Sequence, residues 1–195
     1  MDAREEFLDI FYDNIDRDGA DKLLDWLERS DFFTAPASTR RHNAFKGGLC
    51  EHSVNVYRRL VKLLTLEYGE NWQKKISPES VAIIGLLHDV CKVDTYVEDF
   101  RNVKDDDGVW RKKPCYKVED SLPYGHGEKS VYIISAFMRL TREEALAINW
   151  HMGEFDIRVQ NGSYMISDVF YKYPLCFLAH LADLSATYLD EKLPE

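Results

Sequence analysis

Pro78-Glu-Ser-Val-Ala-Ile-Ile-Gly-Leu-Leu-His-Asp89 is the stretch of this sequence that decides the fold. Proline followed by glutamate is a favourable helix start, and the run from Ser80 to Leu87 is apolar on all sides, as in the central helix of a bundle. His88 and Asp89 end this run, and burial of such groups is costly unless they are paired or coordinated. The stretch therefore predicts a buried central helix that ends in a paired or metal-binding His-Asp. The alternative is a capped helix end that is open to solvent.

Helical periodicity flanks this stretch on both sides. Apolar residues recur at three- to four-residue intervals in segments 4–14, 23–27, 49–64 and 127–140, and again after Pro174. The sequence Thr141-Arg-Glu-Glu144 is a capping box for a further helix that runs to about His151. Residues 153–167 have few periodic positions and predict a loop or a short strand pair.

The periodicity is interrupted between Tyr96 and Tyr124, where Asp107-Gly108 has apolar residues on either side. This pattern predicts a β-hairpin, placed as an insertion at residues 100–124. We therefore expect an all-α fold, a helical bundle with a small β-hairpin excursion. At 195 residues the chain suits a single domain, 1–195, with N-terminal helices in 1–30 and the core in 42–190.

Composition narrows the classes of partner. The formal net charge is -9, which repels phosphate backbones, so we expect no binding of duplex nucleic acid. A phosphate-handling protein of this charge needs a metal or a tight basic pocket. The four cysteines include no C-x-x-C pair, which favours reduced thiols. The N-terminus does not resemble a signal peptide and no apolar run is long enough to span a bilayer, so we expect a cytoplasmic protein without a membrane segment.

Histidines and aspartates recur in a fixed order along the chain. The motifs are Gly47-Gly-Leu-Cys-Glu-His-Ser53, Leu86-Leu-His-Asp-Val-Cys-Lys92, His126, His151 and Ala182-Asp183. Together they resemble the ordered signature of HD-domain phosphohydrolases over roughly residues 42–188. The segments around His52 and His126 are similar to the HD module of bacterial 3'-to-5' exoribonucleases and of small HD hydrolases. From a chain of 195 residues we expect no N-terminal OB-fold domain like that of those exonucleases, so their polymeric substrate is not carried over.

The resemblance implies a metal centre in an HD-type helical bundle. By position, one divalent metal is expected on His52, His88, Asp89 and Asp183. The resemblance gives His126 and His151 either a second metal, with Asp89 as the bridge, or contacts to substrate phosphate. One or two ions per chain are expected, with Mn, Fe, Ni, Co, Zn or Mg left open. The alternative is a set of structural histidines, each satisfied by a neighbouring backbone or carboxylate group.

Lys92 matches the lysine of the HD-x-x-K pattern, and the resemblance implies that it neutralises substrate phosphate. The alternative is a solvated lysine at a helix end. His180 lies three residues before Asp183 and is a candidate to contact a metal ligand or a packed core histidine. His42 receives no role.

Two further segments invite a functional interpretation. Asn14-x-Asp16-x-Asp18-Gly19 followed by Asp25 has the spacing of an EF-hand loop, but Asp21 and Asp25 depart from that pattern, which favours a solvated helix-turn-helix. The predicted hairpin interleaves basic and aromatic residues, which could stack a base and hold phosphate, or could only keep an exposed hairpin soluble. The substrate-binding candidates there are Trp110, Arg111, Lys112 and Tyr124.

Three functions follow from these patterns. The first is a divalent-metal-dependent phosphohydrolase that cleaves a phosphoester or phosphoanhydride in a small phosphorylated substrate, for which we expect a nucleotide. Its catalytic residues would be Asp89 and Lys92. The second is a 3'-to-5' exonuclease on short single strands. The third is a non-catalytic binding module stabilised by its metal. The sequence leaves the substrate, the metal and the oligomeric state open.

Overall fold

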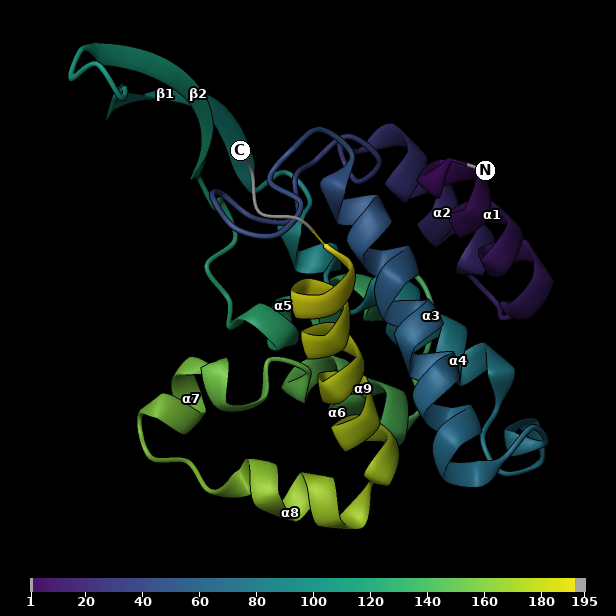
Figure 1. The fold of residues 1–195 in the computed structure, drawn as a ribbon. Coiled ribbons are helices and arrows are strands. Elements are labelled where there is room, and N and C mark those ends of the chain that lie inside the picture. Colours follow the sequence, from purple (N-terminus) through teal and green to yellow (C-terminus); the bar gives the residue numbers. More distant parts are fainter. Residues whose placement is uncertain (1, 192–195) are drawn as a thin grey trace.

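The computed structural model describes residues 2–191, which form a helical body with one projecting hairpin (Figure 1). The larger elements are α1 (Ala3–Asn14), α2 (Ala20–Arg29), α3 (Gly48–Tyr68), α4 (Pro78–Leu87), β1 (Tyr96–Lys104), β2 (Trp110–Val118), α5 (His126–Ser135), α6 (Arg142–Trp150), α8 (Met165–Lys172) and α9 (Pro174–Ser185). Shorter turns are η1 (Trp72–Lys74), η2 (Val90–Lys92), η3 (Gly153–Phe155), α7 (Ile157–Gln160) and the π-helical η4 (Ala186–Asp190). The all-α fold with a small β-hairpin is confirmed.

Helix α4 is the central buried helix that the sequence predicts. Every residue from Val81 to Leu87 is buried, which accounts for the absence of a polar face. The Ser77 hydroxyl accepts a hydrogen bond from the backbone N–H of Ser80, so this residue caps the helix and Pro78 follows at the first position. Helices α1, α3 and α6 pack against α4, and α9 lies across α3 and α6 (Figure 1).

Two glycines allow the helices that carry the histidine motifs to approach closely. A Cβ atom at Gly85 would lie 2.7 Å from the Tyr57 Cα, so glycine is needed where α4 crosses α3. A Cβ atom at Gly127 would lie 2.2 Å from the Asn149 carbonyl oxygen, so glycine is needed where α5 meets α6. Close backbone contact at these two points draws together the helix ends that carry His52, His88, His126 and His151.

The hairpin differs from its predicted limits. Strands β1 and β2 pair antiparallel from Tyr96 with Val118 to Lys104 with Trp110, so the hairpin occupies 96–118 rather than 100–124. The two strands extend away from the helices (Figure 1). Tyr124 lies beyond them, in the segment that leads into α5. The early strand start was missed because Glu98 and Asp99 are residue types that are depleted in strands.

Of the remaining predictions about local structure, some are confirmed and one is wrong. The capping box at Thr141 and Glu144 is confirmed, with both reciprocal hydrogen bonds present. The loop or strand pair predicted at 153–167 is wrong, because η3, α7 and the start of α8 lie there. The EF-hand-like segment is a helix-turn-helix in which Gly19 adopts a φ of 88° before α2. Within residues 2–191, every helix is too short or too polar to cross a membrane.

Candidate metal centre

Six side chains from five helices or helix ends meet at one point in the body. His52 lies in the second turn of α3, while His88 and His151 follow the last residues of α4 and α6. His126 begins α5, and Asp183 lies in α9. The donor cluster, as we define it, consists of His52, His88, Asp89, His126, His151 and Asp183. All the residues to which the sequence assigns metal binding are therefore brought together.

The two carboxylate oxygens of Asp89 divide the donor cluster into halves. Asp89 Oδ2 lies 3.4 Å from His52 Nε2 and 3.6 Å from His88 Nε2. His52 Nε2 is also 3.3 Å from Asp183 Oδ1. Asp89 Oδ1 lies 2.8 Å from His126 Nε2 and 3.4 Å from His151 Nε2. Asp89 is thus the residue that both groups of histidines share.

The outer nitrogens of two histidines fix which ring atoms face the centre. Nδ1 of His88 lies 3.0 Å from the Gly85 carbonyl oxygen, and Nδ1 of His151 lies 2.6 Å from the Ile148 carbonyl oxygen. A carbonyl oxygen only accepts, so Nδ1 carries the proton in both rings and donates. In a neutral ring Nε2 then presents a lone pair, and these two lone pairs point toward Asp89.

The inner nitrogens are poorly satisfied by the protein itself. When His52 is neutral and donates its Nδ1 proton to Glu191, His88 Nε2 and His52 Nε2 face each other at 3.2 Å with two lone pairs, which repel. His151 Nε2 is buried and has no hydrogen-bond partner among residues 2–191. A buried polar atom without a partner typically costs about 1–3 kcal/mol. Lone pairs that converge on a carboxylate are the arrangement that a divalent cation satisfies, so these residues fit a metal ion.

Burial and charge set the protonation of the centre. Burial lowers the pKa of His88 to about 3, which keeps the ring neutral and able to ligate. Burial acts in the same direction on His52, but hydrogen bonds to Asp183 and Glu191 outweigh it and raise its pKa to about 10. Burial opposes ionisation of Asp89, yet the charge of Lys92 holds its pKa well below the usual range. Without a metal, a proton on His52 offsets the carboxylates.

Lys92 reaches the centre because the chain tightens after α4. Residues 90–92 form the 3₁₀ turn η2, in which side chains three positions apart lie almost above one another. Lys92 Nζ therefore lies 2.6 Å from Asp89 Oδ2, and the lysine is buried. The solvated helix-end lysine considered from the sequence is not what the structure shows. Its phosphate-binding role stays a prediction.

Glu191 is a member of the site that the sequence analysis missed. Its Oε1 accepts a hydrogen bond from His52 Nδ1 at 2.8 Å, and its side chain is fully buried. Asn55 Nδ2 donates to the same oxygen at 3.4 Å. The π-helical turn η4 brings the residue back toward α3. Nothing in the spacing of the sequence signals this, because the contact joins positions 139 residues apart.

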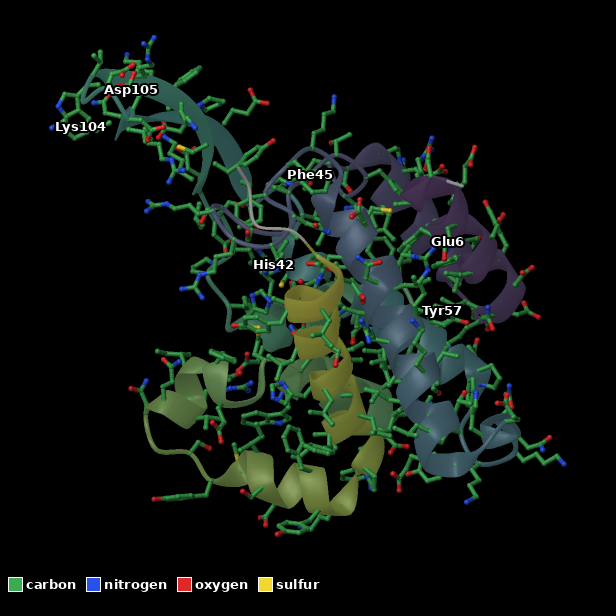
Figure 2. The ribbon with its side chains drawn as sticks, viewed as in Figure 1. Glu6, His42, Phe45, Tyr57, Lys104 and Asp105 are labelled. Carbon is green, nitrogen blue, oxygen red and sulfur yellow. The ribbon has the colours of Figure 1, made fainter. Side chains whose placement is uncertain are left out.

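His42 also lies at the site, although the sequence analysis gave it no role. Its ring centroid is 5.0 Å from that of His52, and Figure 2 shows it near the end of α9. Burial lowers the pKa of His42 to about 4. His180 instead donates from Nδ1 to the His151 backbone carbonyl at 2.7 Å, so it supports the backbone of a member of the donor cluster.

A pocket opens onto the Oδ2 half of the donor cluster. Its walls come from the segment before α3, from η2 and η3, and from α9 with η4. Cationic and apolar side chains surround the members of the donor cluster that line it. The lining residues are Arg41, His42, His52, Asp89, Lys92, Met152, Phe155, Asp183, Leu184, Thr187 and Tyr188.

The substrate-binding candidates on the hairpin are not brought to this pocket. Trp110 pairs with Lys104 at the far end of the strands, and Figure 2 shows Lys104 and Asp105 distant from the helices. At roughly 3.4 Å per residue, nine residues of β1 place Trp110 and Arg111 on the order of 25 Å from its base. Arg111 is paired with Asp105 at 2.6 Å, and Lys112 lies beside it on β2. Tyr124 stacks on Tyr132 near the start of α5.

Comparison with known proteins adds one finding. A family model described as HD domain matches residues 49–185 of the chain. The matched range contains every residue of the donor cluster. The comparisons with curated proteins and with solved structures gave no match.

Proposed function

This chain belongs to the HD domain family, whose members are generally metal-dependent phosphohydrolases, and we propose that its donor cluster binds two divalent ions to hydrolyse a phosphoester or phosphoanhydride of a nucleotide. The observation that carries the proposal is the division of the cluster at Asp89. One carboxylate oxygen faces His52 and His88, of which His52 also contacts Asp183, and the other oxygen faces His126 and His151. This division favours a second metal on His126 and His151 over direct contact with substrate phosphate.

The donor types favour a first-row transition metal. Imidazole nitrogens suit Zn, Fe, Ni and related ions, whereas Mg²⁺ prefers oxygen ligands. Both halves of the cluster contain two histidines, so Mg is the least favoured candidate among those compatible with the family. A bound divalent ion would supply a Lewis acid for the phosphoryl group and would lower the pKa of a water molecule.

The protein's own cations complete the proposed chemistry. Water adds to phosphorus, the ester or anhydride P–O bond breaks, and the leaving oxygen takes a proton. Lys92 and Arg41 line the pocket and would balance charge on the phosphoryl oxygens. Lys92 is already held by Asp89 at 2.6 Å, so little reorganisation is needed when the substrate arrives. Phe155 and Tyr188 provide apolar walls on which a nucleobase would pack.

Replacement of Asp89 tests the proposal most directly. In Asp89→Asn we expect loss of both bound ions by elemental analysis and a fall in nucleotide phosphohydrolase activity of roughly 10³-fold or more. Asp168→Asn, an exposed carboxylate on α8, is the matched control and should leave both unchanged. Undiminished turnover in Asp89→Asn would refute the mechanism. Stoichiometric metal without turnover of any nucleotide would instead support the non-catalytic module.

A further inference from the structure

The hairpin has two outer edges, because its sheet consists of β1 and β2 alone. Just beyond the tip end of β1, the Asp105 N–H donates to the Val109 carbonyl at 2.9 Å, and just before its base the Thr95 carbonyl accepts from the Glu119 N–H at 2.9 Å. Residues of an antiparallel strand face their partner strand alternately, so the odd-numbered residues of β1 bond to β2. The backbone groups of its even-numbered residues therefore point outward, along the free edge.

The outer edge of β1 is open to another strand. The Phe100 N–H is satisfied inside its own strand, where the Asp99 carboxylate accepts it at 2.8 Å. No other segment among residues 2–191 forms hydrogen bonds to the outward groups of β1. Residues 98–102 are exposed, and the hairpin extends away from the helices (Figure 1). Such a row of free backbone donors and acceptors can template the addition of a strand.

The outer edge of β2 is protected. Pro114 lies opposite Phe100 in the register, so it belongs to the residues of β2 that face outward. Proline has no N–H, and the row of outward donors is therefore interrupted at the middle of β2. The three cations Arg111-Lys-Lys113 precede it, and a run of one charge repels an identical strand. Strand addition is thus obstructed on the β2 side and unobstructed on the β1 side.

The open edge is complementary to itself when two copies of β1 pair antiparallel about Phe100. The two-fold axis then places Asp99 opposite Arg101 of the second copy, and symmetry repeats this contact. Val97 lies opposite Val103 in the same register, and outward backbone groups meet outward backbone groups. A shift of the axis by one residue in either direction places Asp99 or Arg101 opposite its own copy, where like charges repel.

Pairing in this register also improves the surroundings of two side chains of the hairpin. Arg101 has Lys113 as its cross-strand neighbour on β2, and like charges in that position destabilise a sheet. Asp99 of the second copy would lie on the other side of Arg101 and offset this repulsion. Phe100, 66% exposed in the single chain, would pack against its own copy, with Pro114 of each chain extending the apolar row.

We propose that the outer edge of β1 is a homodimer interface, at which a second copy of this chain pairs antiparallel with the register centred on Phe100. The product is a four-stranded ribbon in the order β2-β1-β1-β2. Its strands run in opposite directions and each hairpin joins its helices at one end, so the two helical bodies lie at opposite ends of the ribbon (Figure 1). The proposal is independent of the proposed function, because each chain keeps its own donor cluster.

Reversal of single charges tests the register. Sedimentation velocity of the full chain over a concentration series should show a monomer–dimer equilibrium for the wild type. Asp99→Arg and Arg101→Asp each create two contacts between like charges, and we expect self-association about tenfold weaker or more. An equimolar mixture of the two variants restores opposite charges at both contacts, so a heterodimer should form with about the wild-type Kd. Asp168→Arg, on the exposed surface of α8, should leave self-association unchanged.

The Arg101→Asp variant also separates a lost interface from a damaged hairpin. Its new carboxylate would lie opposite Lys113 within the same chain, which favours the hairpin. Tm should therefore equal or exceed that of the wild-type monomer while the dimer is lost. Metal content per chain should be the same in the wild type and in every charge variant, which keeps this test apart from that of the proposed function.

Proline substitution tests the backbone contacts. Asn102 and Lys112 are cross-strand partners whose N–H groups both point outward, from β1 and from β2 respectively. Asn102→Pro removes one hydrogen bond from each half of the dimer, and we expect self-association about tenfold weaker or more. Lys112→Pro makes the same change on the β2 edge and should keep self-association within about threefold of the wild type.

Three outcomes would overturn the proposal. The first is a wild type that stays monomeric up to about 1 mM. The second is equal self-association of the wild type, Asp99→Arg and Asn102→Pro, which would mean that the copies associate through another surface. The third is a mixture of Asp99→Arg and Arg101→Asp that associates no better than either variant alone, which would exclude the antiparallel register centred on Phe100.

Discussion

Helices α4 and α6 carry a buried polar cluster at each end, and the two clusters differ in how completely their hydrogen bonds are made. At the N-terminal ends, Glu144 Oε1 accepts from Ser80 at 2.6 Å and from Arg17 at 3.0 Å. Its Oε2 accepts from Arg17 and from the backbone N–H of Thr141, both at 2.7 Å. We call this the Glu144 cluster. At the C-terminal ends, the donor cluster leaves His151 Nε2 without a partner among residues 2–191.

The difference separates structural from functional burial of charge. The Glu144 carboxylate has no exposed surface, yet each of its oxygens is satisfied by at least two donors. Four members of the donor cluster, His52, His88, Asp89 and His151, are similarly buried, but the imidazole nitrogens face one another and a carboxylate with few protons to share. If burial of charged groups were the only criterion, both the Glu144 cluster and the donor cluster would be candidate functional sites. Only the donor cluster also has unsatisfied acceptors that converge on one point, and this feature identifies it as the candidate functional site.

Removal of metal should produce the largest change in Tm that distinguishes the donor cluster from the Glu144 cluster. An ion that binds only the folded chain at 1,000 times its Kd adds about 4 kcal/mol of stability, or roughly 8–16 °C in Tm for a chain of this size. We expect chelation to lower Tm by this amount in the wild type, as measured by calorimetry. Glu144→Gln should show the same shift from a lower starting Tm. An unchanged Tm on chelation would contradict a metal in the donor cluster.

The Glu144 cluster should respond to mutation and not to metal. Glu144→Gln removes the charge that Arg17 pairs with inside the body, and we expect a loss of about 3 kcal/mol, or roughly 6–12 °C in Tm. This loss of stability is at the lower end of the range for breaking a buried ion pair, because Arg17 retains its second ion pair, with Glu79 at 2.7 Å. Metal content should match that of the wild type. Asp168→Asn serves as the surface control, with a change within about 0.5 kcal/mol.

The sequence predicts the donor cluster well because its members lie in motifs of short range. His88-Asp89 follows an apolar run that can only be a buried helix, and the other members stand in a recognisable order. The helix starts at Pro78 and after the Thr141 cap are likewise signalled locally, and the structure contains both. Local chemistry of this kind does not depend on the rest of the fold.

What the sequence does not predict depends on contacts between distant segments. Glu191 reaches His52 only through a π-helical turn, and the Glu144 cluster joins Arg17 to a helix 127 residues later. The hairpin candidates were chosen by composition, but the distance from Trp110 to the helices is a property of strand length and direction. Residues 153–167 were misjudged because turns as short as η3 and α7 are below the length that periodicity detects.

Glu191→Gln should weaken metal binding without removing the site. A carboxylate that accepts from Nδ1 orients the ring and makes Nε2 a better ligand, and loss of such a partner typically costs 10–100-fold in metal affinity. We expect this range for the ion at His52 in competition titrations with a chromophoric chelator. Asp190→Asn changes the neighbouring carboxylate, which pairs with Arg59 instead, and should keep wild-type affinity. Equal weakening by both variants would assign the effect to the turn rather than to His52.

The smallest expected effect is a pH dependence confined to the Glu144 cluster. Burial acts to raise the pKa of Glu144, but hydrogen bonds from Arg17 and Ser80 outweigh it and lower the pKa below 4.5. A carboxyl group with a lowered pKa in the folded state adds stability that is present above the unfolded pKa and is lost as pH falls through the folded value. The Tm difference between wild type and Glu144→Gln should therefore be constant from pH 7 to about pH 5 and should narrow below 4.5. Chelator in every sample keeps the donor cluster from contributing through metal release. A protonated glutamic acid resembles glutamine in charge, so a gap that stays unchanged at pH 3 would mean that packing, and not the Arg17 ion pair, holds this end of α4 and α6 together.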